Sequence, residues 1–149
     1  MSLSEAERKL LDRELDLLAQ ATSVLEYSYR RCKAIGAKAD LNQEEQDQFE
    51  AFTSRFARLS DILIQRLFRL VDKLDLEEPG TVRDRINRAE KKALIPSAET
   101  FGIIRDVRNA IAHEYLPEAI RAIHDQALKY APMLLDSVGR FKEYCKRYQ

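Results

Sequence analysis

Apolar residues recur along the chain at alternating steps of three and four, which is the period of an amphipathic helix. The longest such series predicts one long helix, and its members are Phe49, Phe52, Phe56, Leu59, Leu63, Leu67, Leu70 and Leu74. A second series predicts the first helix, and it consists of Leu11, Leu15, Leu18, Thr22, Leu25, Tyr29 and Cys32. The strict alternation that is typical of strands is almost absent. The pattern therefore predicts an all-α protein.

Capping residues and helix breakers predict where the helices begin and end. The first helix follows Ser4 and ends near Ile35 before Gly36, the second follows Asn42 and ends before Glu78-Pro79-Gly80, the third runs from Thr81 to about Leu94, the fourth from about Ala98 to near Tyr115, and the fifth begins at Pro117. Amphipathic helices joined by short loops form an up-and-down bundle. We therefore expect a bundle of about five helices, with residues 1–149 as a single domain.

Composition narrows the class of protein further. The 149 residues carry 25 basic and 25 acidic side chains, so no global charge attracts nucleic acid. The longest stretch without a charged residue is the nine residues from Leu17 to Leu25, too short to cross a membrane. No secretory signal precedes the first helix, and Cys32 and Cys145 have no paired spacing. We expect free thiols in a cytoplasmic protein that does not contact the membrane.

The charges are unevenly distributed. Residues 51–92 carry 10 basic and 7 acidic side chains, and arginine predominates among the basic ones. Arginine is the better planar partner for phosphate. The alternative interpretation is a set of solvated helix faces with ion pairs four residues apart. Glycine-rich phosphate loops and metal-ligand spacings are absent from the sequence, so we expect no cofactor and no metal.

One segment, Ile104 to Tyr115, combines residues that suit chemistry on a phosphate. Arg108, Asn109 and His113 fall mostly off the apolar face of the predicted fourth helix. Arg108 and His113 are separated by about 140° of rotation and about 7.5 Å of rise on an ideal helix, but the last turn frays and arginine is long. Both side chains can then reach one phosphate, where histidine moves protons and arginine stabilises the phosphorane, without a metal.

Structural roles account for the same residues equally well. A histidine near a helix C-terminus interacts favourably with the helix dipole, and an arginine beside a carboxylate forms a surface ion pair. His124, the other histidine, lies near the apolar face of the last helix, and we interpret it as structural.

The segment from Arg108 to Tyr115 resembles the Arg-x4-His-x-Tyr signature of HepT-type toxins in the HEPN superfamily. Asn109 matches the polar residue that usually follows the arginine in that family. The motif also closes a helix just before the proline-started final helix, as in the family. The specific motif covers eight residues, although the helix order and the length fit the whole chain.

The resemblance implies a metal-independent ribonuclease that acts as a homodimer on RNA, with Arg108 and His113 as catalytic residues and Asn109 orienting them. It implies a small nucleotidyltransferase as the antitoxin partner, which can transfer AMP to the motif tyrosine, here Tyr115. Some bundles of this superfamily are instead non-catalytic partners of such nucleotidyltransferases. A helical bundle for protein–protein contact is a third interpretation.

Overall fold

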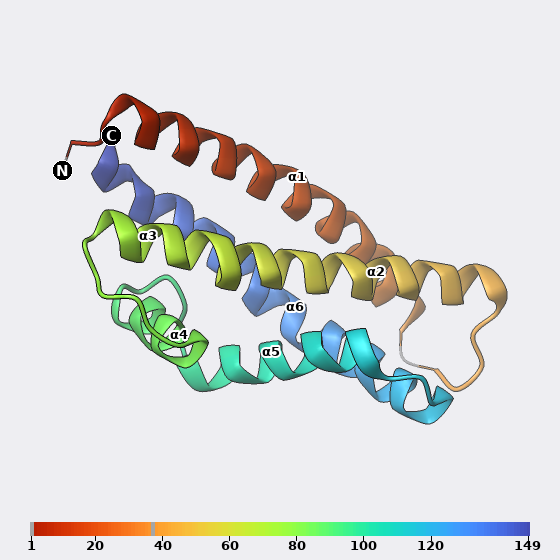
Figure 1. Cartoon of the computed structure of the whole chain (residues 1–149). Coiled ribbons are helices and arrows are strands. Elements are labelled where there is room, and N and C mark those ends of the chain that lie inside the picture. The colour runs from red at the N-terminus through yellow and green to blue at the C-terminus, as the bar shows by residue number, and fades with distance from the viewer. Residues whose placement is uncertain (1, 37) are drawn as a thin grey trace.

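A computed structural model describes residues 2–36 and 38–149, and about 82% of the chain is helical. The elements are α1 (Glu5–Ile35), α2 (Gln43–Asp61), the π-helical segment η1 (Ile62–Leu67), α3 (Phe68–Leu74), α4 (Val82–Lys91), α5 (Ala98–His113), α6 (Pro117–Cys145) and the 3-10 turn η2 (Lys146–Tyr148). With α2, η1 and α3 counted as one continuous helix, the described residues form five long or medium helices and no strand (Figure 1). The predicted all-α helical bundle is confirmed.

The helix starts follow the predicted capping chemistry. Ser4, Asn42 and Thr81 each accept a hydrogen bond from the backbone N–H three residues later, and that residue's carboxylate accepts one from the cap's own N–H. These reciprocal bonds satisfy N–H groups that have no partner within the helix. At the end of α1, Gly36 adopts a φ of 74° and donates its N–H to Cys32 O. Glycine adopts such a positive φ readily because it has no Cβ.

The long helix formed by α2, η1 and α3 buries the entire predicted apolar series. All eight of its members, from Phe49 to Leu74, are buried. Each fully buried Leu or Phe contributes about 1.5–3 kcal/mol relative to an exposed one. The π-helical turn between Ile62 and Leu67 was not predicted, and Ile62, Leu63 and Ile64 are three consecutive buried residues there. The helix is therefore covered on several sides at this point, because one apolar face cannot hold three successive positions.

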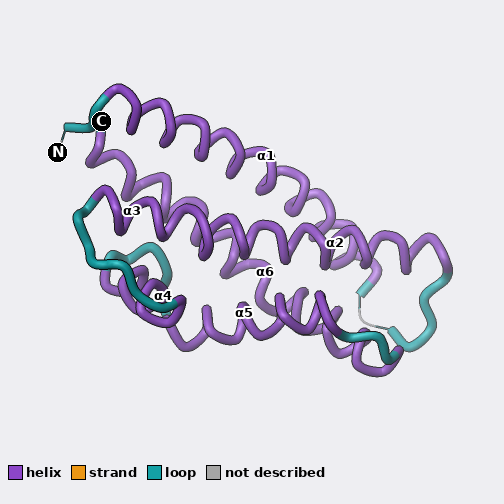
Figure 2. The backbone as a smooth tube through the Cα atoms, viewed as in Figure 1, coloured by secondary structure: helices purple, strands orange, loops and turns teal. Residues whose placement is uncertain are grey.

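The other helices pack against this long helix on several sides and leave one face of it open (Figures 1 and 2). α1 packs against α2 and α6, while α5 packs against α2, α6 and the short α4. α4 also contacts η1 and α3. The start of α1 and the end of α6 lie at the same end of the bundle, and loops join the helices at the two ends (Figure 2). α5 is thereby fixed beside α2, which determines the surroundings of Arg108.

Two predicted details are corrected by the structure. The fourth helix ends at His113 rather than near Tyr115, because Glu114 already has extended backbone angles ahead of Leu116-Pro117. The third helix ends at Lys91 rather than near Leu94, and Leu94 is nevertheless buried. On the last helix Ala127, Leu134, Val138, Phe141 and Cys145 are buried and Tyr130 is partly buried, whereas Ile120 near its start is 36% exposed.

A polar cluster joins the C-terminus to the end of the long helix. Tyr144 and Tyr148 both donate their hydroxyl groups to the Asp75 carboxylate, and the Lys92 ammonium lies 2.9 Å from it. Burial by itself raises the pKa of Asp75, but these hydrogen bonds and the lysine charge outweigh it, so the pKa is lowered. The ionised carboxylate thus links the end of α3 to α6, to η2 and to Lys92 at the end of α4.

We expect Asp75→Asn to lower the free energy of unfolding by about 1–3 kcal/mol near neutral pH, since it weakens charge-assisted hydrogen bonds. Because the pKa of Asp75 is lower in the folded state, its contribution is present above the unfolded value near 3.8 and is lost as the pH falls through the folded value. Urea unfolding of the wild type and of Asp75→Asn, at about pH 7 and again at about pH 3, measures the difference between their free energies of unfolding. A difference between the chains that stays constant with pH would contradict the prediction.

Candidate functional site

Helix α5 carries the motif residues and is anchored by its apolar face. Ser97 caps its N-terminus by accepting a hydrogen bond from Thr100 N. Ile104 and Val107 are buried in the core, and Ile111 is partly buried against it. The opposite face of the helix therefore remains available for polar side chains.

Arg108 makes a two-point ion pair with Asp61, the last residue of α2. Arg108 Nε lies 2.8 Å from Asp61 Oδ1, and Arg108 Nη2 lies 2.9 Å from Oδ2. Such a planar fork holds the guanidinium in one orientation. The hydrogen bonds to Asp61 raise the pKa of Arg108, so the side chain stays cationic.

Arg108 and Asn109 line a depression between α5 and the long helix. Its volume is about 700 Å³, and we call it the arginine depression because four arginines and one carboxylate are its charged residues. It is lined by Ser54, Ala57, Arg58, Ser60, Asp61, Ile62, Ile64, Gln65, Arg66, Arg105, Arg108 and Asn109. A concave surface with excess positive charge suits an anionic ligand.

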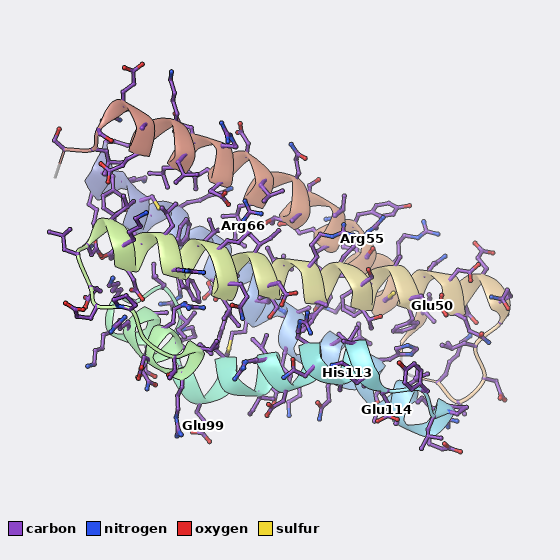
Figure 3. The ribbon with its side chains drawn as sticks, in the orientation of Figure 1. Glu50, Arg55, Arg66, Glu99, His113 and Glu114 are labelled. Atoms are coloured by element: carbon purple, nitrogen blue, oxygen red, sulfur yellow. The ribbon has the colours of Figure 1, made fainter. Side chains whose placement is uncertain are left out.

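His113 and Tyr115 lie outside this depression. His113 is the last residue of α5 and is exposed, and Figure 3 shows it with Glu114 at the C-terminal end of that helix. Tyr115 is 82% exposed. One chain therefore brings Arg108 and Asn109 together but leaves His113 more than one helical turn away. The ion pair of Arg108 and the position of His113 in the last turn also fit the structural roles weighed above.

His124 is partly buried against the core residue Phe49 and lies away from the motif. Its ring stacks on Phe49, with centroids 4.4 Å apart and an interplanar angle of 19°. Burial lowers the pKa of His124, and the charges of Asp125 and Glu50 offset this only in part. The structural interpretation of this histidine agrees with its environment.

Metal binding and thiol chemistry would depend on other side chains of residues 2–36 and 38–149. No group of three or more His, Cys, Asp or Glu side chains there is arranged to hold a metal ion. Cys32 and Cys145 are free, as predicted, and burial raises the pKa of their thiols to about 11 and about 12. Within the same residues no helix combines the length and the hydropathy needed to cross a membrane.

Two residues beside Arg108 were not singled out from the sequence. Asp61 directly precedes three consecutive apolar residues, Ile62 to Ile64, and a charge at that position was the available signal. Arg105 precedes Arg108 by three positions, so the two share a helix face. The partner of Arg108 itself depends on how α5 packs against α2, which no local pattern reports.

Comparison of the chain with protein-family models, with curated proteins and with solved structures finds no match.

The environment of His124 predicts a pH dependence of stability. Its pKa is lower in the folded state than in the unfolded chain, so the unfolded state binds more protons as the pH falls below about 6.5. The wild type should lose free energy of unfolding as the pH falls from about 7 to about 5, and we expect His124→Gln to lose less. Urea unfolding of the two proteins measures both losses. Lys129→Gln on the same helix is the control, because lysine does not titrate in this range. Identical pH curves for wild type and His124→Gln would contradict the assignment.

Proposed function

We propose that this protein is a metal-independent ribonuclease of a toxin–antitoxin module. The observation that carries the proposal is the guanidinium of Arg108, which is held rigidly at the rim of a depression rich in arginine. The motif resemblance supplies the roles, with Arg108 and His113 catalytic and Asn109 orienting them. A cation fixed before the substrate arrives is the arrangement that best stabilises charge developing on a phosphate.

The reaction that suits these residues uses the RNA ribose itself. The 2′-oxygen attacks the adjacent phosphorus, and the bond from phosphorus to the 5′-oxygen breaks, which leaves a 2′,3′-cyclic phosphate and a 5′-hydroxyl. A base accepts the proton of the 2′-hydroxyl, and an acid gives a proton to the departing 5′-oxygen. Histidine serves in either role near neutral pH, while arginine stabilises the pentacovalent phosphorane.

A homodimer would bring two copies of the motif to one cleft. Each chain offers one motif histidine, whereas the reaction profits from one group at the attacking oxygen and another at the leaving oxygen. Two-fold symmetry supplies both from a single motif. The exposure of His113 and Tyr115 leaves the end of α5 accessible for such a contact.

Tyr115 is the proposed point of control by a nucleotidyltransferase antitoxin. Its ring is exposed and it follows His113 by two residues, so an enzyme can reach its hydroxyl. Transfer of AMP from ATP would form a phosphodiester on that hydroxyl and release pyrophosphate. The added negative charge and the adenosine would then occupy the surface beside the motif.

The second candidate is a non-catalytic partner of a nucleotidyltransferase. Tyr115 and Leu116 are exposed apolar residues at the turn between α5 and α6, and Ile120 follows them on α6. Exposed apolar residues of this kind are typical of contact with another protein. The satisfied ion pair between Arg108 and Asp61 also suits a protein without catalysis.

We expect Arg108→Ala and His113→Ala each to reduce RNA cleavage by at least about 100-fold, because each removes charge stabilisation or proton transfer in the transition state. Cleavage of a fluorescent RNA by the purified protein measures this, with and without EDTA. His113→Ala should leave the melting temperature nearly unchanged because the residue is exposed, and Arg13→Ala on α1 is the matched control.

Each of three results would contradict one part of this proposal. Absence of cleavage by the wild-type protein would favour the non-catalytic partner, and loss of cleavage in EDTA would exclude the metal-independent reaction. Light scattering at about 10–100 µM measures the oligomeric state, which depends on concentration. A strictly monomeric protein in that range would exclude the shared cleft.

Modification of Tyr115 is a separate expectation. Incubation with the partner nucleotidyltransferase and ATP should add AMP to the protein, and peptide mass spectrometry should locate it on Tyr115. Tyr115→Phe should remain unmodified and stay active in its presence, whereas Tyr130→Phe, at a partly buried tyrosine of α6, should behave as wild type. Complete neutralisation by the partner without any modified tyrosine would show inhibition by binding alone.

A further inference from the structure

The arginine depression contains positive charge that the described residues do not neutralise. Arg66 bonds to Glu14 of α1, with Nε 3.0 Å from Oε2, and Figure 3 shows Arg66 on the part of the long helix nearer α3. Arg108 bonds to Asp61. Arg58 and Arg105 are exposed and make no ion pair with any residue in the described part of the chain. Two free cations therefore remain on opposite walls, one on the long helix and one on α5.

The ion pair with Asp61 leaves part of Arg108 free for a ligand. A guanidinium has five N–H donors, and Asp61 uses one on Nε and one on Nη2. The edge formed by Nη1 and the second Nη2 hydrogen makes no hydrogen bond to the residues that the structure describes. Arg108 can thus bind Asp61 with one edge and a phosphate with the other, and Asp61 determines where the second edge points.

A hydroxyl in the wall lacks a partner. Ser60 precedes Asp61, lines the depression and is completely buried, and its Oγ has no hydrogen-bond partner among the described residues. Unsatisfied buried polar groups are rare in folded proteins. The Oγ atom itself is fully buried, so this hydroxyl belongs to the wall of the depression and is not a direct contact for a ligand.

The remaining lining indicates what kind of anion fits. The depression contains no aromatic side chain on which a base could stack, so its polar contacts are suited to phosphates rather than to bases. The neighbouring depression that shares Arg105 contains Glu99 and Asp106 as well as Arg83, so acidic and basic residues balance there. The depression that shares Arg66 adds Arg69 and Lys73, so the positive charge continues along the long helix. Backbone contacts of this kind give binding that depends on salt and tolerates many sequences.

We propose that the arginine depression is a binding site for the phosphodiester backbone of single-stranded RNA, in which Arg58 and Arg105 hold a phosphate that flanks the one at the free edge of Arg108. This assignment rests on the proposed ribonuclease function and adds Arg58, Arg105 and Asp61 to the residues of its site. Asp61 is a positioning residue, because it acts through Arg108. A single strand is required because attack by the 2′-oxygen needs a backbone that can turn the leaving oxygen opposite to it.

Binding is tested with a probe that this reaction cannot cleave. Fluorescence anisotropy of a 2′-O-methyl single-stranded oligonucleotide gives the dissociation constant for the whole chain at several salt concentrations. We expect Arg58→Ala with Arg105→Ala to weaken binding at least about 10-fold and to lower the slope of log K against log salt by about 0.7, the value for one lost phosphate contact. Arg13→Ala on α1 should change neither, because it keeps the depression intact.

Substitution of Asp61 distinguishes an effect of its charge alone from a role in positioning Arg108, because the two predict opposite changes in the affinity for the probe. Removal of a carboxylate from an anion site should strengthen binding if charge alone matters. If Asp61 positions Arg108, Asp61→Asn should instead weaken binding of the probe and lower kcat for RNA, and Asp61→Glu should restore part of both. Tighter binding by Asp61→Asn, with its melting temperature retained, would overturn the positioning role.

The failure of this proposal and the failure of the ribonuclease are distinguishable. Probe binding that depends on Arg58 and Arg105 without any RNA cleavage would support the site and reject the nuclease. RNA cleavage together with unchanged probe binding by the double variant would overturn the site and leave the nuclease standing. Tighter binding of a duplex than of the single strand would overturn the assignment of the ligand.

Discussion

The long helix from Gln43 to Leu74 must be buried on several sides, and the rest of the bundle follows from that constraint. Its apolar residues occupy one continuous face over eight positions, and around η1 they extend to neighbouring positions as well. A helix with so much apolar surface is stable in water only when other helices cover it. α1, α4, α5 and α6 all contact this helix or its π-helical segment (Figure 1).

The same packing places polar groups where the helices meet. Asp61 ends α2 just before the π-helical turn, and α5 lies close enough for Arg108 to reach it. One turn further along, Arg66 reaches α1 instead and binds Glu14. π-helical segments are frequent at functional sites because they disturb the regular spacing of a helix. Here the segment lies in the wall of the arginine depression, beside the residues that carry charge.

The motif combines a rigid part and an accessible part. Arg108 is held by Asp61 and by the burial of Val107 beside it, whereas His113 and Tyr115 lie at the exposed end of α5. An arginine that is oriented before the substrate arrives loses little entropy on binding. The exposed residues lie where a second chain or a modifying enzyme can reach them. This division agrees with a site that two chains complete, and equally with contact to a different protein.

Most of the fold could be predicted from the sequence because its signals are local. The period of three and four gave the helices and their buried faces, and Ser4, Asn42 and Thr81 gave the starts of three helices, since a cap and its partner are only three residues apart. The end of α5 was predicted two residues late, because a frayed last turn leaves little trace in the pattern. The motif residues were also visible, since they fall off the apolar face of one helix.

The pairing of Arg108 with Asp61, the separation of His113 from the depression and the free charges of Arg58 and Arg105 were decided only by the tertiary structure. Arg108 and Asp61 are 47 positions apart, and no local pattern around either residue indicates that the other is its partner. The sequence by itself determined which faces of the helices are apolar, because that depends on neighbours three or four residues away. Which polar faces meet depends on how the helices pack, and that is a property of the whole bundle.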